Sequence, residues 1–65
     1  MEPYQQRLVE EQVQLAQRIN KLKRFIYSQI FKELPQAKRD LLGEQLSLMV
    51  AYLKILDQRI ELEGV

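Results

Sequence analysis

Apolar side chains in the segment 41–62 cover more of a helix than a single partner helix can bury. At about 100° per residue, they form two neighbouring stripes. The first stripe consists of Leu42, Leu46, Met49, Leu53, Leu56 and Ile60. The second stripe consists of Leu41, Leu48, Ile55 and Leu62. The combined apolar arc is roughly 200° wide, whereas a surface helix of a monomer needs about 100°. The pattern therefore predicts assembly with other chains, and we expect this assembly to bury the first stripe.

A polar line runs between the two stripes. Gln45, Tyr52 and Arg59 follow one another at intervals of seven residues, so they share one side of the predicted helix. We expect Tyr52 to be a core or interface residue with its hydroxyl satisfied at the edge. Arg59 has apolar neighbours one turn away, and a desolvated guanidinium needs an acceptor. That acceptor could be a carboxylate, solvent reached along the aliphatic stem, or a ligand phosphate.

The first half of the chain shows the same helical spacing. Its periodic apolar residues are Leu8, Leu15, Ile19, Leu22, Ile26 and Ile30. Pro3 suits the first turn of a helix. The pattern predicts a first helix from about Pro3 to Tyr27.

Proline and glycine mark the remaining boundaries. The residue before a proline disfavours helical backbone angles, so Pro35 or Gln36 should begin the second long helix. Gly64 should stop this helix near Glu63. Between the helices, Ser28 could cap a short extra turn or lie inside a continuous, bent helix. The isolated Gly43 is typical of a tolerated surface position or a close helix crossing.

These elements predict an all-α fold, an antiparallel helical hairpin with a short connecting turn near 28–35. We expect residues 1–65 to form one domain. Chains below about 70 to 80 residues seldom build a sufficient core without a disulfide, a bound metal or association with another chain. The sequence contains no cysteine, so disulfides and thiolate metal sites are excluded. Self-association is the remaining route to stability, and several hairpins should pack into a homo-oligomeric bundle.

The residues offer little for catalysis. With neither histidine nor cysteine, the usual base, nucleophile and soft metal ligands are missing. Carboxylates such as Glu10 and Glu11 lie in ordinary solvated surroundings. We therefore expect no enzyme, no metal and no cofactor. The start of the chain lacks a signal sequence and no window is apolar enough to span a membrane, so we also expect a soluble intracellular protein.

Binding chemistry is better represented, along one side of the first helix. Residues there recur at spacings of three and four, and an aromatic marks each end. They are Tyr4, Arg7, Glu11, Gln14, Arg18, Lys21 and Phe25. Aromatic rings stack on nucleobases and basic groups pair with phosphates, so this strip could bind a nucleotide, or it could simply be a solvated face. The net charge of +1 argues against a strongly basic DNA or RNA binder.

The joint spacing of several short motifs resembles a known family. The motifs are the start Pro3-Tyr4-Gln5-Gln6-Arg7, the Ser28-x-x-Phe31 turn, and the late Leu56-x-x-Arg59-Ile60. Together with the helical core positions between them, they resemble small bacteriophage proteins of the anti-CBASS cyclic-nucleotide sponge type, over nearly the whole chain.

The resemblance implies a homohexamer that sequesters cyclic oligonucleotide messengers in the host cytoplasm without cleaving them. It implies one pocket between paired protomers for cyclic dinucleotides, with Tyr4 stacking on a base and Lys21 pairing with phosphate. Arg18 is the rival of Lys21, one turn away. It implies a second pocket near a three-fold axis for cyclic trinucleotides, with Arg59 as the phosphate ligand. Asp57 could weaken that pocket by pairing with Arg59 or repelling the ligand.

A different class of function uses the same apolar surface. A phage structural or assembly adaptor would bind another protein through the wide helix face and would have no affinity for cyclic nucleotides. A small DNA-binding regulator would need a converging basic face, and no helix-turn-helix segment is visible for it.

Overall fold

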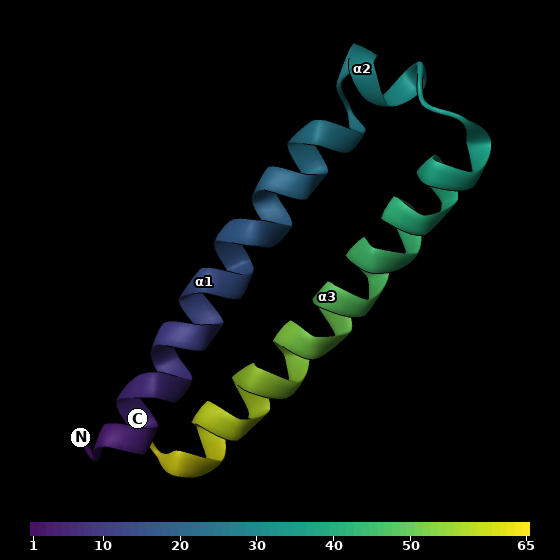
Figure 1. Cartoon of the computed structure of the whole chain (residues 1–65). Helices are drawn as coiled ribbons and strands as arrows, with labels where there is room; N and C mark the ends of the chain where they lie inside the picture. The colour runs from purple at the N-terminus through teal and green to yellow at the C-terminus, as the bar shows by residue number, and fades with distance from the viewer.

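The computed structural model describes residues 1–65 as three helices in a hairpin. The long helices α1 (Pro3–Ile26) and α3 (Gln36–Glu63) lie side by side in opposite directions, joined by the short α2 (Gln29–Lys32) (Figure 1). The hairpin measures 46 × 15 × 13 Å, and both termini lie at the end opposite α2. The predicted all-α helical hairpin is confirmed.

The first helix begins as its sequence predicts. Pro3 occupies the first turn of α1. The Glu2 backbone N–H donates to Gln5 Oε1 at 2.9 Å, which ties the start of the helix to its own first turn. Tyr27, the predicted end, is the residue that caps the C-terminus of α1.

Ser28 caps a separate short turn, so the first of its two alternatives is correct. Its hydroxyl oxygen accepts a hydrogen bond from the Phe31 backbone N–H at 3.3 Å. The same hydroxyl donates to the Phe25 carbonyl at 2.6 Å. The rings of Phe25 and Phe31 meet edge to face with centroids 6.1 Å apart, which closes the turn on its apolar side.

The second long helix begins and ends at the predicted residues. Pro35 precedes its first residue, and Gly64 adopts a left-handed φ of 74° at its end. Glycine takes this angle without the steric cost that other residues meet. Gly43 is exposed, and a Cβ there would meet nothing within 4 Å, so the hairpin itself makes no close crossing at this position.

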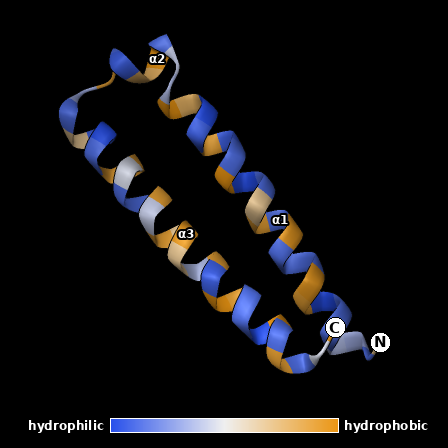
Figure 2. Ribbon diagram, turned by 180° about the vertical axis from the view of Figure 1, so that it is seen from behind, coloured by the Kyte–Doolittle hydropathy of each residue, from blue (hydrophilic) through white to orange (hydrophobic).

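The core lies between α1 and the first stripe of α3. Its buried residues are Leu8, Leu15 and Ile19 of α1 and Leu56 of α3. Partly buried residues of α3 pack around them: Leu46, Met49, Val50, Leu53 and Ile60. Hydrophobic residues recur along the full length of both long helices (Figure 2). The hairpin itself therefore covers much of the first stripe, since α1 packs against it, but only Leu56 is fully buried there. Further burial of this stripe by assembly stays a prediction.

The second stripe is the one left without a partner. Leu48 is 71 % exposed and Leu62 is 88 % exposed, and Leu41 and Ile55 are exposed as well. A single α1 can cover only one side of α3, so the width of the apolar arc leaves these four side chains in solvent. The over-wide pattern read from the sequence thus corresponds to a real surface of the folded chain.

Candidate functional site

The residues predicted to bind a cyclic dinucleotide lie far apart on α1. Arg18 and Lys21 are exposed and one turn apart. Tyr4 lies in the first turn, and at a rise of 1.5 Å per residue it is about 25 Å from Lys21 along the helix. The structure brings the two basic residues together and leaves Tyr4 at the other end. No small ligand can touch Tyr4 and Lys21 of the same chain at once.

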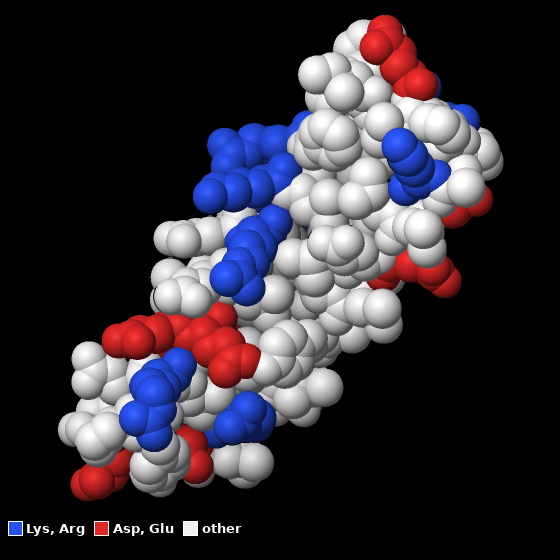
Figure 3. All heavy atoms as spheres, in the orientation of Figure 1, with Lys and Arg blue, Asp and Glu red and all other residues white.

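Charge is unevenly distributed along α1. Lys and Arg side chains gather beside its C-terminal half, and acidic side chains lie nearer its N-terminus (Figure 3). The C-terminal half contains Arg18, Lys21, Lys23 and Arg24, all of them exposed. The basic end of α1 is therefore free to meet an anion, while the aromatic Tyr4 lies beyond an acidic stretch.

The Tyr4 hydroxyl is tied to the last turn of α3. It donates to Glu63 Oε1 at 2.7 Å, and Gln5 Nε2 donates to the same oxygen at 2.9 Å. The hydrogen bond to Glu63 raises the pKa of the Tyr4 phenol. The bonds from Tyr4 and Gln5 lower the pKa of the Glu63 carboxyl. Sequence analysis missed Glu63, because only the hairpin brings its two ends together.

A second tyrosine also links the two long helices, but here the tyrosine belongs to α3 and the carboxylate to α1. The Tyr52 hydroxyl, from α3, donates to Glu11 Oε1 of α1. This hydrogen bond raises the pKa of the Tyr52 phenol, and the positive charge of Arg59 opposes the shift. Tyr52 is 41 % exposed, so it is not a core residue of the hairpin. Its ring stands at the edge of the helix contact, where its hydroxyl is bonded as predicted.

Arg59 is exposed between these two connections. Its positive charge opposes the rise in the pKa of Tyr52, seven residues before it. The hydrogen bonds from Tyr4 and Gln5 make the larger contributions to the lowered pKa of Glu63, and the charge of Arg59 lowers it further. Asp57, which could have engaged the guanidinium, instead accepts a hydrogen bond from Gln12 Nε2 at 2.6 Å. Asp57 is thus turned toward α1.

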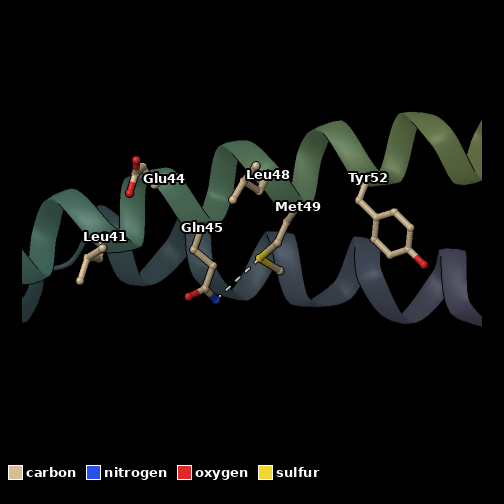
Figure 4. Close-up of a pocket in the computed structure, with 6 residues that line it drawn as sticks. All are labelled: Leu41, Glu44, Gln45, Leu48, Met49 and Tyr52. Carbon is tan, nitrogen blue, oxygen red and sulfur yellow. Dashed lines mark hydrogen bonds between the residues drawn. The ribbon is translucent and has the colours of Figure 1, made fainter.

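A shallow depression of about 500 Å³ lies along one flank of α3. Its lining residues are Leu41, Glu44, Gln45, Leu48, Met49 and Tyr52 (Figure 4). Gln45 Nε2 donates to Met49 Sδ at 3.8 Å across it. All six residues belong to one helix, and two of them belong to the exposed second stripe. The depression is part of the uncovered apolar face, with the Tyr52 ring at one end.

The hairpin has neither a metal-binding cluster nor a membrane-spanning helix. No three side chains among His, Cys, Asp and Glu are grouped so that they could hold a metal ion. No helix carries an apolar stretch long enough to span a lipid bilayer.

Comparison with known proteins assigns the family. A search of curated proteins and a search of solved structures found no match. The model of the Sequestin family matches residues 2–62, which include α1, the turn and all of α3 except its last residue, Glu63. The name of the family denotes sequestration, in keeping with a binding role without catalysis. Since the match extends over almost the whole chain, the protein belongs to the Sequestin family.

Proposed function

We propose that the protein sequesters cyclic oligonucleotide second messengers without cleaving them. The observation that carries this proposal is the Sequestin match over residues 2–62. In the cytoplasm of a bacterial host, a phage protein of this kind withholds the activator of CBASS effectors and so blocks the defence. The chain contains no His or Cys, which suits binding without chemistry.

The proposal includes a homo-oligomer, with the hexamer that the family resemblance implies. Its support is the exposed second stripe of α3, formed by Leu41, Leu48, Ile55 and Leu62. A contiguous apolar surface of this kind on a small protein commonly marks an interaction site. A second copy of the chain supplies the same stripe and can cover it symmetrically.

The dinucleotide pocket is proposed to be shared between two chains. Tyr4 and Lys21 of one chain are about 25 Å apart along α1, too far for one ligand. Two α1 helices packed in opposite directions would place Tyr4 of one copy near Lys21 or Arg18 of the other. One ring would then stack on a base while the facing cation pairs with a phosphate.

The trinucleotide pocket is proposed to use Arg59 from several copies. Like charges gathered around one axis repel, and a bound phosphate relieves that repulsion. The Asp57 carboxylate accepts a hydrogen bond from Gln12 on α1, which directs it away from this pocket. Arg59 is exposed in the hairpin and can reach a ligand from there.

A retention and recovery assay tests the function. The protein is incubated with a panel of cyclic di- and trinucleotides, filtered, denatured, and the released ligand is identified by chromatography and mass. We expect depletion of at least one ligand and its recovery intact. Recovery of linear products would indicate an enzyme. No depletion of any ligand would refute the sponge and favour an assembly adaptor that uses the apolar face to bind another protein.

Matched variants assign the residues. Tyr4→Ala should abolish dinucleotide retention, while Tyr27→Ala removes an exposed tyrosine outside the proposed pockets and should not. Arg59→Ala should abolish trinucleotide retention, with Lys54→Ala as its control on the same helix. Arg18→Ala and Lys21→Ala, compared with Lys23→Ala, identify the phosphate ligand. If Tyr4→Ala and Arg59→Ala left every affinity unchanged, both pockets would be wrongly assigned.

A further inference from the structure

Glu63 occupies a position that its own helix does not favour. It is the last residue of α3, and the final turn contains no basic side chain. The C-terminus of a helix carries partial negative charge, so a carboxylate there is unfavourable. Within α3, the positive charge of Arg59 offsets part of this cost. The larger compensation comes from the other helix.

Two consecutive residues of α1 supply that compensation. The Tyr4 hydroxyl and the Gln5 side-chain amide both donate to Glu63 Oε1, at 2.7 and 2.9 Å. Hydrogen bonds to a charged acceptor are roughly twice as strong as those between neutral groups. The first turn of α1 and the last turn of α3 are therefore joined at a single oxygen atom.

The contact restrains the tip of the Tyr4 ring and leaves the ring accessible. Tyr4 is 52 % exposed although its hydroxyl is bonded. A tyrosine in the first turn of a terminal helix would otherwise sample several rotamers, and ordering it on binding would cost affinity. With the hydroxyl held, the ring is presented to a base in one orientation before the ligand arrives.

We propose that Glu63 is the positioning residue for Tyr4, so that the last turn of α3 sets the affinity of the aromatic pocket on α1. The inference rests on the proposed function, because it requires Tyr4 to stack on a ligand base. Glu63 itself touches no ligand. Gln5 assists by donating a hydrogen bond to the same carboxylate oxygen.

Four variants test this inference, with cyclic di-AMP, cyclic di-GMP and cyclic GMP-AMP as probes in equilibrium binding. Glu63→Ala and Tyr4→Phe should each lower the affinity for the bound dinucleotide by about tenfold, which corresponds to the loss of one hydrogen bond. The double variant should lose no more than either single one, because both remove the same contact. Glu63→Gln keeps an acceptor oxygen and should stay within about threefold of wild type. Glu61→Ala, an exposed carboxylate in the same turn, is the matched control and should bind normally.

The results separate positioning from charge and from assembly. If Glu63→Gln bound the ligand as weakly as Glu63→Ala, an acceptor oxygen at this position would not be enough to hold Tyr4, and the inference would be wrong. Additive losses in the double variant would also contradict it. Light scattering establishes that each variant keeps the wild-type mass. Tyr4→Phe retains the ring and serves as the second test if Glu63→Ala fails to fold.

A ligand-free measurement checks the contact itself. In protein with carbon-13 at the tyrosine ring, the Tyr4 pKa should fall toward that of an ordinary tyrosine in Glu63→Ala and stay raised in Glu61→Ala. Failure of wild type to bind any of the three probes would overturn both the dinucleotide function and the positioning role. Binding by wild type with no change in Glu63→Ala and Tyr4→Phe would overturn the positioning role alone.

Discussion

The two apolar stripes of α3 have nearly the same composition and opposite surroundings. Adjacent residues show the contrast most clearly, since Leu56 is fully buried and Ile55 is 53 % exposed. The first stripe packs against α1 of the same chain, and the second has no partner in the hairpin. The difference shows that hydrophobicity alone does not determine burial. The position of a stripe relative to α1 decides which leucines form the core.

The comparison also separates two sources of stability. Contacts of the first stripe stabilise the hairpin itself, whereas contacts of the second stripe can form only between molecules. A core of four buried residues is small, and small domains of this kind commonly depend on association. Substitutions in the first stripe should therefore destabilise the hairpin, and substitutions in the second stripe should weaken association between chains.

The largest effect is expected in the first stripe, at Leu56. Leu56→Ala removes a fully buried side chain and leaves a cavity, so it should lower the free energy of unfolding by about 2–5 kcal/mol. Urea denaturation followed by circular dichroism measures this. Lys54→Ala, an exposed position two residues away, should change stability by less than about 0.5 kcal/mol. Equal losses in both variants would contradict the assignment of the core.

The next largest effect is expected in the second stripe, as a change in the molecular mass of the particle in solution. Leu48→Asp places a charge in the exposed apolar face and should dissociate the proposed oligomer, with helix content retained. Sedimentation or light scattering would show the fall in mass. Lys54→Asp introduces the same charge elsewhere on α3 and should leave the assembly intact. A Leu48→Asp protein with the wild-type mass would mean that the second stripe does not mediate assembly.

A smaller effect of opposite sign is expected at Gly43. An alanine there meets nothing within 4 Å in the hairpin and removes the helix cost of glycine, so Gly43→Ala should stabilise by about 0.8–1.0 kcal/mol. The thermal midpoint measures this. Destabilisation together with a loss of mass would reveal that another chain crosses α3 closely at Gly43, which would extend the intermolecular surface beyond the second stripe.

The smallest effect belongs to the polar edge of the helix contact and depends on pH. The hydrogen bonds from Tyr4 and Gln5 lower the pKa of Glu63 below its ordinary value. The stabilisation is therefore present above the pKa of the unfolded chain and is lost as pH falls through the lower folded value. Glu63→Gln should flatten the dependence of urea unfolding on pH in this acid range, whereas Glu61→Gln should not. An unchanged slope in Glu63→Gln would show that the contact contributes nothing to stability.

The ends of the elements could be predicted because local rules govern them. Pro3, Pro35 and Gly64 restrict backbone angles whatever the rest of the chain does, and all three helix ends they predict are present. The role of Ser28 could not be predicted from local rules, since a serine can cap a turn or continue a helix. Its hydrogen bonds with Phe25 and Phe31 select the cap.

The candidate site was predictable only in part. The residue pattern suggested an aromatic and basic strip on one helix face, and the family resemblance selected Tyr4, Lys21 and its rival Arg18 from that strip. The resemblance also selected the late Arg59. Their roles stay predictions. Glu63 could not be found from local spacing, because its partners lie 58 and 59 residues away in the chain.

The sequence by itself determined where the helices begin and end, and that their apolar surface exceeds what one hairpin can bury. Both follow from backbone sterics and from a period of 3.6 residues, which act within a few residues of each position. Only the tertiary structure decided which stripe of α3 meets α1 and that Glu63 holds Tyr4. The rotation of one helix against another depends on the summed packing of side chains distant in the chain, and no local pattern contains that sum.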